Sequence, residues 1–119
     1  MPTQITILGL GQIGGSIGMA LGKMKNPLQR VGYDKDSSVA RAAESVGAVD
    51  QIKNLTIAVR EADIILLCLP LGELRETLQK IGPHLKKNAI IIDTSPIKNS
   101  MIEWTKEYLP ADSLYIGLV

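Results

Sequence analysis

The residues with the clearest chemical potential form a glycine-rich loop after a short apolar run. Gln4 to Leu8 lead directly into Gly9-Leu10-Gly11-Gln12-Ile13-Gly14, and Asp34 follows about twenty residues later. Glycine permits tight turns and close backbone approach, and the N–H groups that begin a helix attract phosphate. An acid at the end of the next strand can accept hydrogen bonds from ribose hydroxyls. This order predicts a site for the pyrophosphate and ribose of a dinucleotide.

Each glycine in the loop has an expected task. Gly9 allows the turn off the first strand, Gly11 lets the backbone approach the pyrophosphate, and Gly14 permits close contact between helix and strand. The alternative is a glycine-rich strand-to-helix turn without a ligand. Glycine inside a helix costs roughly 1 kcal/mol relative to alanine, so several glycines in one turn need a reason. We therefore favour nucleotide binding.

The acid at the ribose position favours one form of the cofactor. A 2′-phosphate next to Asp34 would meet like-charge repulsion, so the sequence predicts NAD, with NADP less favoured. Lys35 is a cation that could tolerate such a phosphate, but we interpret it as a solvated charge at the strand end.

Two further strand ends are expected at the same crevice, where open α/β sheets bind their ligands. Leu69 and Pro70 follow the third long apolar run and should line the nucleotide groove. Thr94 and Ser95 follow the next run and offer hydroxyls near the expected nicotinamide position, with Lys98 close behind. Ordinary strand-exit turns are the alternative interpretation of both segments.

Apolar runs alternate with amphipathic helical patterns along the whole chain. This alternation predicts an α/β fold of the Rossmann type, a doubly wound parallel sheet in three α/β/α layers. Strands are expected at residues 5–8, 30–33, 64–69, 89–92 and 114–116, with a short extra one near 50–52. Helices are expected at about 12–25, from 37 to Gly47, 55–60, through Leu74, Leu78 and Ile81 to Gly82, and 99–109.

Composition restricts the function classes. The 119 residues suffice for one domain, and the net charge of +1 gives no field that favours nucleic acid or an anionic membrane as a partner. The single histidine, His84, and single cysteine, Cys68, supply no metal constellation. We expect a buried structural thiol at Cys68 and a surface histidine away from the cofactor. The start of the chain has no signal-peptide pattern, which favours a cytoplasmic protein.

The ordered set of motifs resembles the nucleotide-binding domain of prephenate and arogenate dehydrogenases. The resemblance spans essentially the whole chain and includes the glycine loop, Gly32-Tyr33-Asp34, Gly47-Ala48-Val49-Asp50, Glu61-Ala62-Asp63 and Pro83-His84-Leu85-Lys86. It implies NAD(P)-dependent oxidative decarboxylation of prephenate or arogenate in tyrosine biosynthesis. It also implies a second, helical domain that dimerises and closes the substrate pocket, so residues 1–119 would be the first domain of a longer homodimeric protein.

Two departures from the family pattern leave the catalytic residues unassigned. The family serine stands just before the Val/Ile-Lys pair, where this chain has Pro96, and Ser95 is one position away. The family histidine follows a glycine pair after the sixth strand, where this chain has Gly117-Leu118-Val119. We therefore expect the isolated chain to bind NAD without turnover.

Two other functions stay open. One is a dehydrogenase of another substrate class, such as a β-hydroxyacid or imine reductase. The other is a non-catalytic NAD-sensing module, in which cofactor binding changes an interface. Both kinds of protein would carry the same glycine loop and acid.

Overall fold

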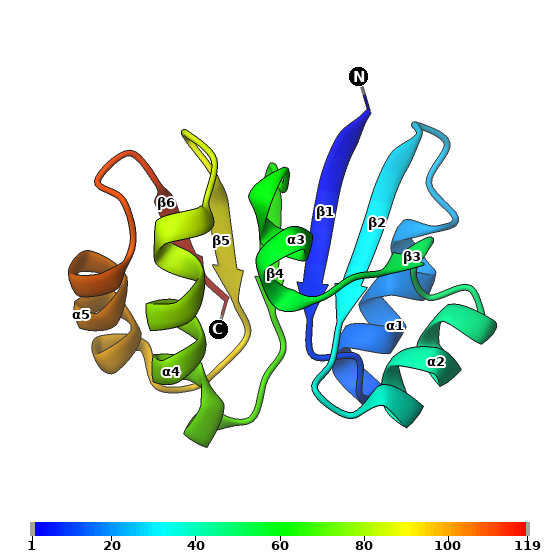
Figure 1. Ribbon diagram of the computed structural model, residues 1–119, viewed down its shortest axis with the longest axis horizontal. Helices are drawn as coiled ribbons and strands as arrows, with labels where there is room; N and C mark the ends of the chain where they lie inside the picture. Colours follow the sequence, from blue (N-terminus) through cyan, green and yellow to red (C-terminus); the bar gives the residue numbers. More distant parts are fainter. Residues whose placement is uncertain (1, 119) are drawn as a thin grey trace.

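The structure is a computed structural model that describes residues 2–118. Within them, strands and helices alternate as the sequence pattern predicts (Figure 1). In chain order the elements are β1 (Thr3–Leu8), α1 (Gln12–Leu21), β2 (Leu28–Tyr33), α2 (Ser37–Ser45), β3 (Gln51–Ile52), α3 (Leu55–Arg60), β4 (Ile64–Leu67), α4 (Leu71–Ile81), the 3₁₀ helix η1 (Gly82–His84), β5 (Ile90–Asp93), α5 (Lys98–Tyr108) and β6 (Leu114–Gly117).

The strands form one parallel sheet in the order β3-β2-β1-β4-β5-β6. The order reverses between β1 and β4, which creates the crevice where doubly wound sheets bind ligands. The register aligns the strand ends, because Leu8 lies opposite both Tyr33 and Leu67, and Leu67 lies opposite Asp93. The chain therefore leaves β1, β2, β4 and β5 at one edge, the lower edge in Figure 1.

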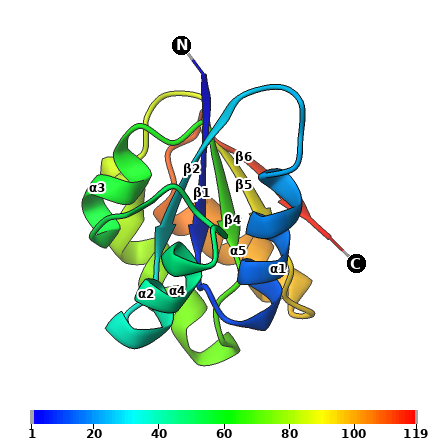
Figure 2. The ribbon, with the colours of Figure 1, turned by 90° about the vertical axis from the view of Figure 1, so that its right-hand side faces the viewer.

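The sheet separates two apolar layers, which confirms the three-layer architecture. On β1, Ile5 and Ile7 pack with residues of α2 and with Ile17 of α1, whereas Leu8 packs with residues of α3, α4 and α5. Figure 2 shows α1 and α3 on opposite sides of the sheet. The run Ile65–Leu67 is buried from both sides, as continuous apolar runs in parallel strands predict.

Several predicted ends differ from the structure by one or two residues, since β1 and β2 each begin two residues earlier than expected, and two differences concern the ends of α1 and β4. Helix α1 ends at Leu21, not Lys25, so its last turn contains no basic residue. At this end of the helix the Arg30 guanidinium donates hydrogen bonds to the carbonyl oxygens of Gly18 at 2.9 Å and Ala48 at 3.0 Å. The Gly18 carbonyl also accepts the Gly22 N–H, so the cation from β2 adds to a hydrogen bond at the negative end of the helix dipole. Strand β4 ends at Leu67, which places Cys68 in the loop that follows.

None of the helices described between residues 2 and 118 is long and apolar enough to span a bilayer.

Candidate nucleotide site

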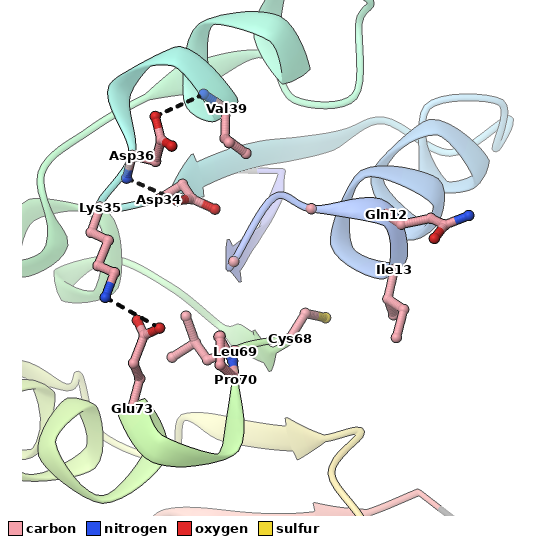
Figure 3. A pocket seen from close by; sticks show the side chains of 12 residues that line it. Gln12, Ile13, Asp34, Lys35, Asp36, Val39, Cys68, Leu69, Pro70 and Glu73 are labelled. Atoms are coloured by element: carbon pink, nitrogen blue, oxygen red, sulfur yellow. Dashed lines mark hydrogen bonds and ion pairs between the residues drawn. The ribbon is translucent and has the colours of Figure 1, made fainter.

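A cavity of about 530 Å³ opens where β1, β2 and β4 end. One wall comes from the glycine loop and the loop after β2, and the opposite wall comes from the loop between β4 and α4 (Figure 3). Its lining residues are Gly9, Gly11, Gln12, Ile13, Asp34, Lys35, Asp36, Val39, Cys68, Leu69, Pro70 and Glu73.

Two loop glycines are required by the fold itself. Gly9 has a φ of +95°, and a Cβ there would collide with the carbonyl oxygen of Cys68. A Cβ on Gly14 would collide with the carbonyl oxygen of Gly9, so close contact between α1 and the loop needs glycine at that position. These positions are explained without any ligand.

Gly11 is different. Its φ is −71°, which any residue adopts, and a Cβ added there would have no neighbouring atom within 4 Å. Internal packing therefore gives no reason for glycine at this position, although Gly11 lines the cavity. Close approach of a ligand to the backbone would supply one.

The start of α1 offers donors to that ligand. No described side chain caps α1 at Gly11, whereas the Asp36 carboxylate caps α2 and the Asn54 amide oxygen caps α3. The first N–H groups of a helix have no intrahelical partner and lie at the positive end of its dipole. Helices α4 and α5 also lack a side-chain cap, but α1 follows the glycine loop directly. These donors can hold a pyrophosphate.

Asp34 joins the glycine loop to the loop after β2. Its Oδ2 accepts a hydrogen bond from the Leu10 N–H, and its Oδ1 accepts one from the Asp36 N–H, both at 2.9 Å. A carboxylate has about four lone-pair sites, so about two remain for ribose hydroxyls. The acid is therefore fixed in place by the backbone and can still bind a ribose.

Cys68 is half-buried and lines the cavity, so the expectation of a buried structural thiol was wrong in part. The strand ends one residue earlier, and the Cys68 backbone turns toward Gly9. Burial raises the pKa of the Cys68 thiol and, with the nearby Asp93 charge, outweighs the opposing Thr94 hydrogen bond. The thiol is therefore protonated at neutral pH and is a poor nucleophile.

Thr94 and Ser95 are not among the residues that line the cavity. The Thr94 hydroxyl donates to the carbonyl oxygen of Leu67 at 3.1 Å, and the Ser95 hydroxyl donates to the Asp93 carboxylate at 2.8 Å. Both hydroxyls are engaged within the protein because their loop turns back over the end of β5. Their contact with a cofactor stays a prediction.

Asp93 is the main polar residue that the sequence analysis left without a role. It is fully buried, and its carboxylate accepts hydrogen bonds from Ser95, from the Lys98 ammonium at 3.2 Å and from the Tyr115 hydroxyl at 2.8 Å. Burial, and then the hydrogen bond to Asp93, raise the pKa of Tyr115. In the sequence, an acid at the end of an apolar run with Lys98 five residues later is the pattern that could have indicated this cluster.

The structure brings most of the predicted site residues together. Leu10 and Gly14 are buried behind the loop and shape it, while the other loop residues, Asp34, Leu69 and Pro70 face the cavity. His84 is half-buried in η1, which leads toward the opposite edge of the sheet, away from the cavity. Lys35 and Glu73, by contrast, lie at the cavity and form an ion pair.

The strand order, the open glycine loop and the fixed acid define a nucleotide-binding domain of the Rossmann type. The chain belongs to the prephenate dehydrogenase nucleotide-binding domain family, because residues 17–117 match that family. It is 36% identical over 107 residues to the cyclohexadienyl dehydrogenase of Zymomonas mobilis, covering 89% of this chain and 36% of that protein. It is 33% identical over 101 residues to the prephenate dehydrogenase of Lactococcus lactis, covering 84% of this chain and 28% of that protein. The chain thus spans about a third of the length of these relatives.

Solved structures share the fold. The arogenate dehydrogenase of Synechocystis superposes with a TM-score of 0.84 at 28% identity, over 97% of this chain and 40% of that one. The prephenate dehydrogenase of A. aeolicus, solved with hydroxyphenyl propionate and NAD+, superposes with a TM-score of 0.84 at 21% identity, over 98% of this chain and 41% of that one. A 3-hydroxyisobutyrate dehydrogenase of Mycobacterium tuberculosis superposes with a TM-score of 0.83 at 26% identity, over 98% of this chain and 40% of that one.

Proposed function

We propose that this chain binds NAD in the cavity beside Asp34 and serves as the cofactor domain of a dehydrogenase that acts on prephenate or arogenate. The observation that carries the proposal is Gly11, a cavity-lining glycine that the fold does not require. NAD would supply the hydride acceptor. This chain would hold the pyrophosphate at the start of α1 and the adenosine ribose at Asp34.

The reaction also needs a substrate held against the nicotinamide in a near-attack geometry. The substrate pocket and a dimer contact are proposed to come from a second domain, since relatives of this chain are about three times as long. Under this proposal residues 1–119 bind the cofactor but have no activity by themselves. A cytoplasmic location belongs to the same proposal.

Calorimetric titration of the chain with NAD and with NADP tests the binding step. We expect saturable binding of NAD and weaker binding of NADP. A chain that is folded by circular dichroism but binds no NAD would refute the proposal. Reduction of NAD with prephenate by residues 1–119 alone would refute the need for a second domain.

A second candidate is a dehydrogenase of another substrate class. The similarity to 3-hydroxyisobutyrate dehydrogenase favours it, because this neighbour is as similar in fold as the arogenate enzyme. Both classes bind the cofactor in the same way, so NAD binding by this chain does not separate them. Substrate-dependent reduction of NAD by the chain joined to a second domain would separate the two candidates.

A further inference from the structure

The cavity holds an ion pair between its two walls. Lys35, in the loop after β2, lies with its Nζ 3.4 Å from Oε2 of Glu73, which is in the first turn of α4. Figure 3 shows the two side chains meeting at one end of the cavity, with Lys35 reaching down from the loop that carries Asp34. The Lys35 side chain is 69% exposed and that of Glu73 is 29% exposed, so the glutamate is the better anchored partner.

This position is next to the expected 2′-hydroxyl of the adenosine ribose. Asp34 marks that hydroxyl, and Lys35 follows it directly in the chain. Enzymes that use NADP place a cation here to accept the 2′-phosphate. Lys35 has the charge for that task, but Glu73 already pairs with it.

The surrounding charge points the same way. Asp34, Asp36 and Glu73 bring three carboxylates to the cavity, whereas Lys35 brings one ammonium. A 2′-phosphate would therefore enter a region with a formal charge of about −2. The start of α4 also favours the Glu73 carboxylate, because it lies near the positive end of that helix dipole.

We propose that Glu73 is a specificity-determining residue that disfavours NADP by neutralising Lys35 from the opposite wall of the cavity. The inference rests on the proposed binding of NAD. Asp34 repels the 2′-phosphate directly, and Glu73 removes the one lining cation that could attract it. Selection between the two cofactors is thus shared between β2 and α4.

The test compares Glu73→Gln with Glu76→Gln by calorimetric titration with NAD and NADP. Glu76 lies on the same helix and within electrostatic reach of Lys35, but its carboxylate pairs with Lys80 at 2.9 Å, and it does not line the cavity. We expect Glu73→Gln to raise the affinity for NADP relative to NAD by about twofold to fivefold, the scale of releasing one partly exposed ion pair beside a phosphate. The ratio for Glu76→Gln should change less than the ratio for Glu73→Gln, because only Glu73 pairs directly with Lys35.

Lys35→Met in the Glu73→Gln background tests whether the Lys35 ammonium is the group that attracts the 2′-phosphate. We expect the gain for NADP to disappear, because the released ammonium is its source. The gain should also shrink when ionic strength rises from about 0.01 M to about 1 M, as the Debye length falls from about 30 Å to about 3 Å. An unchanged ratio in Glu73→Gln, or a gain that persists without Lys35, would overturn the inference.

Failure of the inference differs from failure of the proposed function. If the unaltered chain binds NAD and Glu73→Gln leaves the ratio unchanged, only the role of Glu73 is refuted. If the folded unaltered chain binds no NAD, the proposed function is refuted and the inference with it.

Discussion

The Asp34 carboxylate accepts a hydrogen bond from the Leu10 N–H at 2.9 Å. This contact joins the acid after β2 to the middle of the glycine loop, 24 residues earlier. Asp34 therefore has two tasks: it fixes the loop that would hold the pyrophosphate, and it keeps oxygen lone pairs for the ribose. A single substitution at Asp34 should disturb both halves of the nucleotide site.

Asp34→Ala removes both backbone contacts and the ribose acceptor. We expect the affinity for NAD to fall at least about tenfold, since a hydrogen bond to a charged group contributes about 1.5–3 kcal/mol. Calorimetry measures this loss. Asp34→Asn is the matched control, because its amide oxygen can still accept from Leu10, and it should lose less affinity. Equal affinity in the parent and Asp34→Ala would remove Asp34 from the site.

Gly11→Ala separates folding from binding. Its added Cβ meets no protein atom within 4 Å, so the free energy of unfolding should fall by no more than about 1 kcal/mol, the scale of a poorer helix cap. NAD affinity should fall sharply, because the methyl group occupies the path of the pyrophosphate. Urea unfolding and calorimetry on one preparation give both quantities.

Gly14→Ala is the contrasting variant. Its Cβ would collide with the Gly9 carbonyl oxygen, so the backbone must shift at a cost of about 1–3 kcal/mol in unfolding free energy. A Gly11→Ala protein that loses stability but retains NAD affinity would reverse the roles assigned to the two glycines.

The Asp93 cluster is expected to support stability. Asp93→Ala removes the acceptor of the Tyr115 hydroxyl and the carboxylate partner of the Lys98 ammonium, which still donates to the Asp93 backbone carbonyl at 3.0 Å. Because several hydrogen bonds to the carboxylate are lost together, the cost should exceed the roughly 1.5–3 kcal/mol of a single one. Tyr115→Phe removes a single donor to the carboxylate. Its cost in unfolding free energy should therefore be roughly the 1.5–3 kcal/mol of one hydrogen bond to a charged group. Thermal unfolding of both variants checks the order. Equal melting temperatures for the parent and Asp93→Ala would contradict the cluster's role.

Asp36 is expected to make the stability of the fold sensitive to acid. Hydrogen bonds from the Ser38 hydroxyl and then from the Ser38 and Val39 N–H groups hold the pKa of Asp36 below its ordinary 3.8. A lowered folded-state pKa gives stability that is fully present above 3.8 and is lost as pH falls through the folded value. Asp36→Asn keeps a capping oxygen but cannot titrate, so its stability should decline less with acid. Urea midpoints across this pH window measure the difference, and parallel curves for the two proteins would exclude the effect.

The sequence by itself determined the fold class, the positions of the strands and most of the residues that line the cavity. Continuous apolar runs fixed the buried strands, and the spacing from Gly9 to Asp34 fixed the nucleotide motif, because these signals are local and periodic. Only the structure separated Gly9 and Gly14, which packing requires, from Gly11, which it does not.

The remaining features depend on contacts between distant segments. Arg30 donates to the end of α1, the Ser95 hydroxyl donates to the Asp93 carboxylate, and Glu73 reaches Lys35 from the opposite wall. Lys35 and Glu73 are both ordinary charged residues in the sequence, and no local pattern links them. The parallel register of β1, β2 and β4 brings their loops together, so tertiary structure alone decided which charges meet at the cavity.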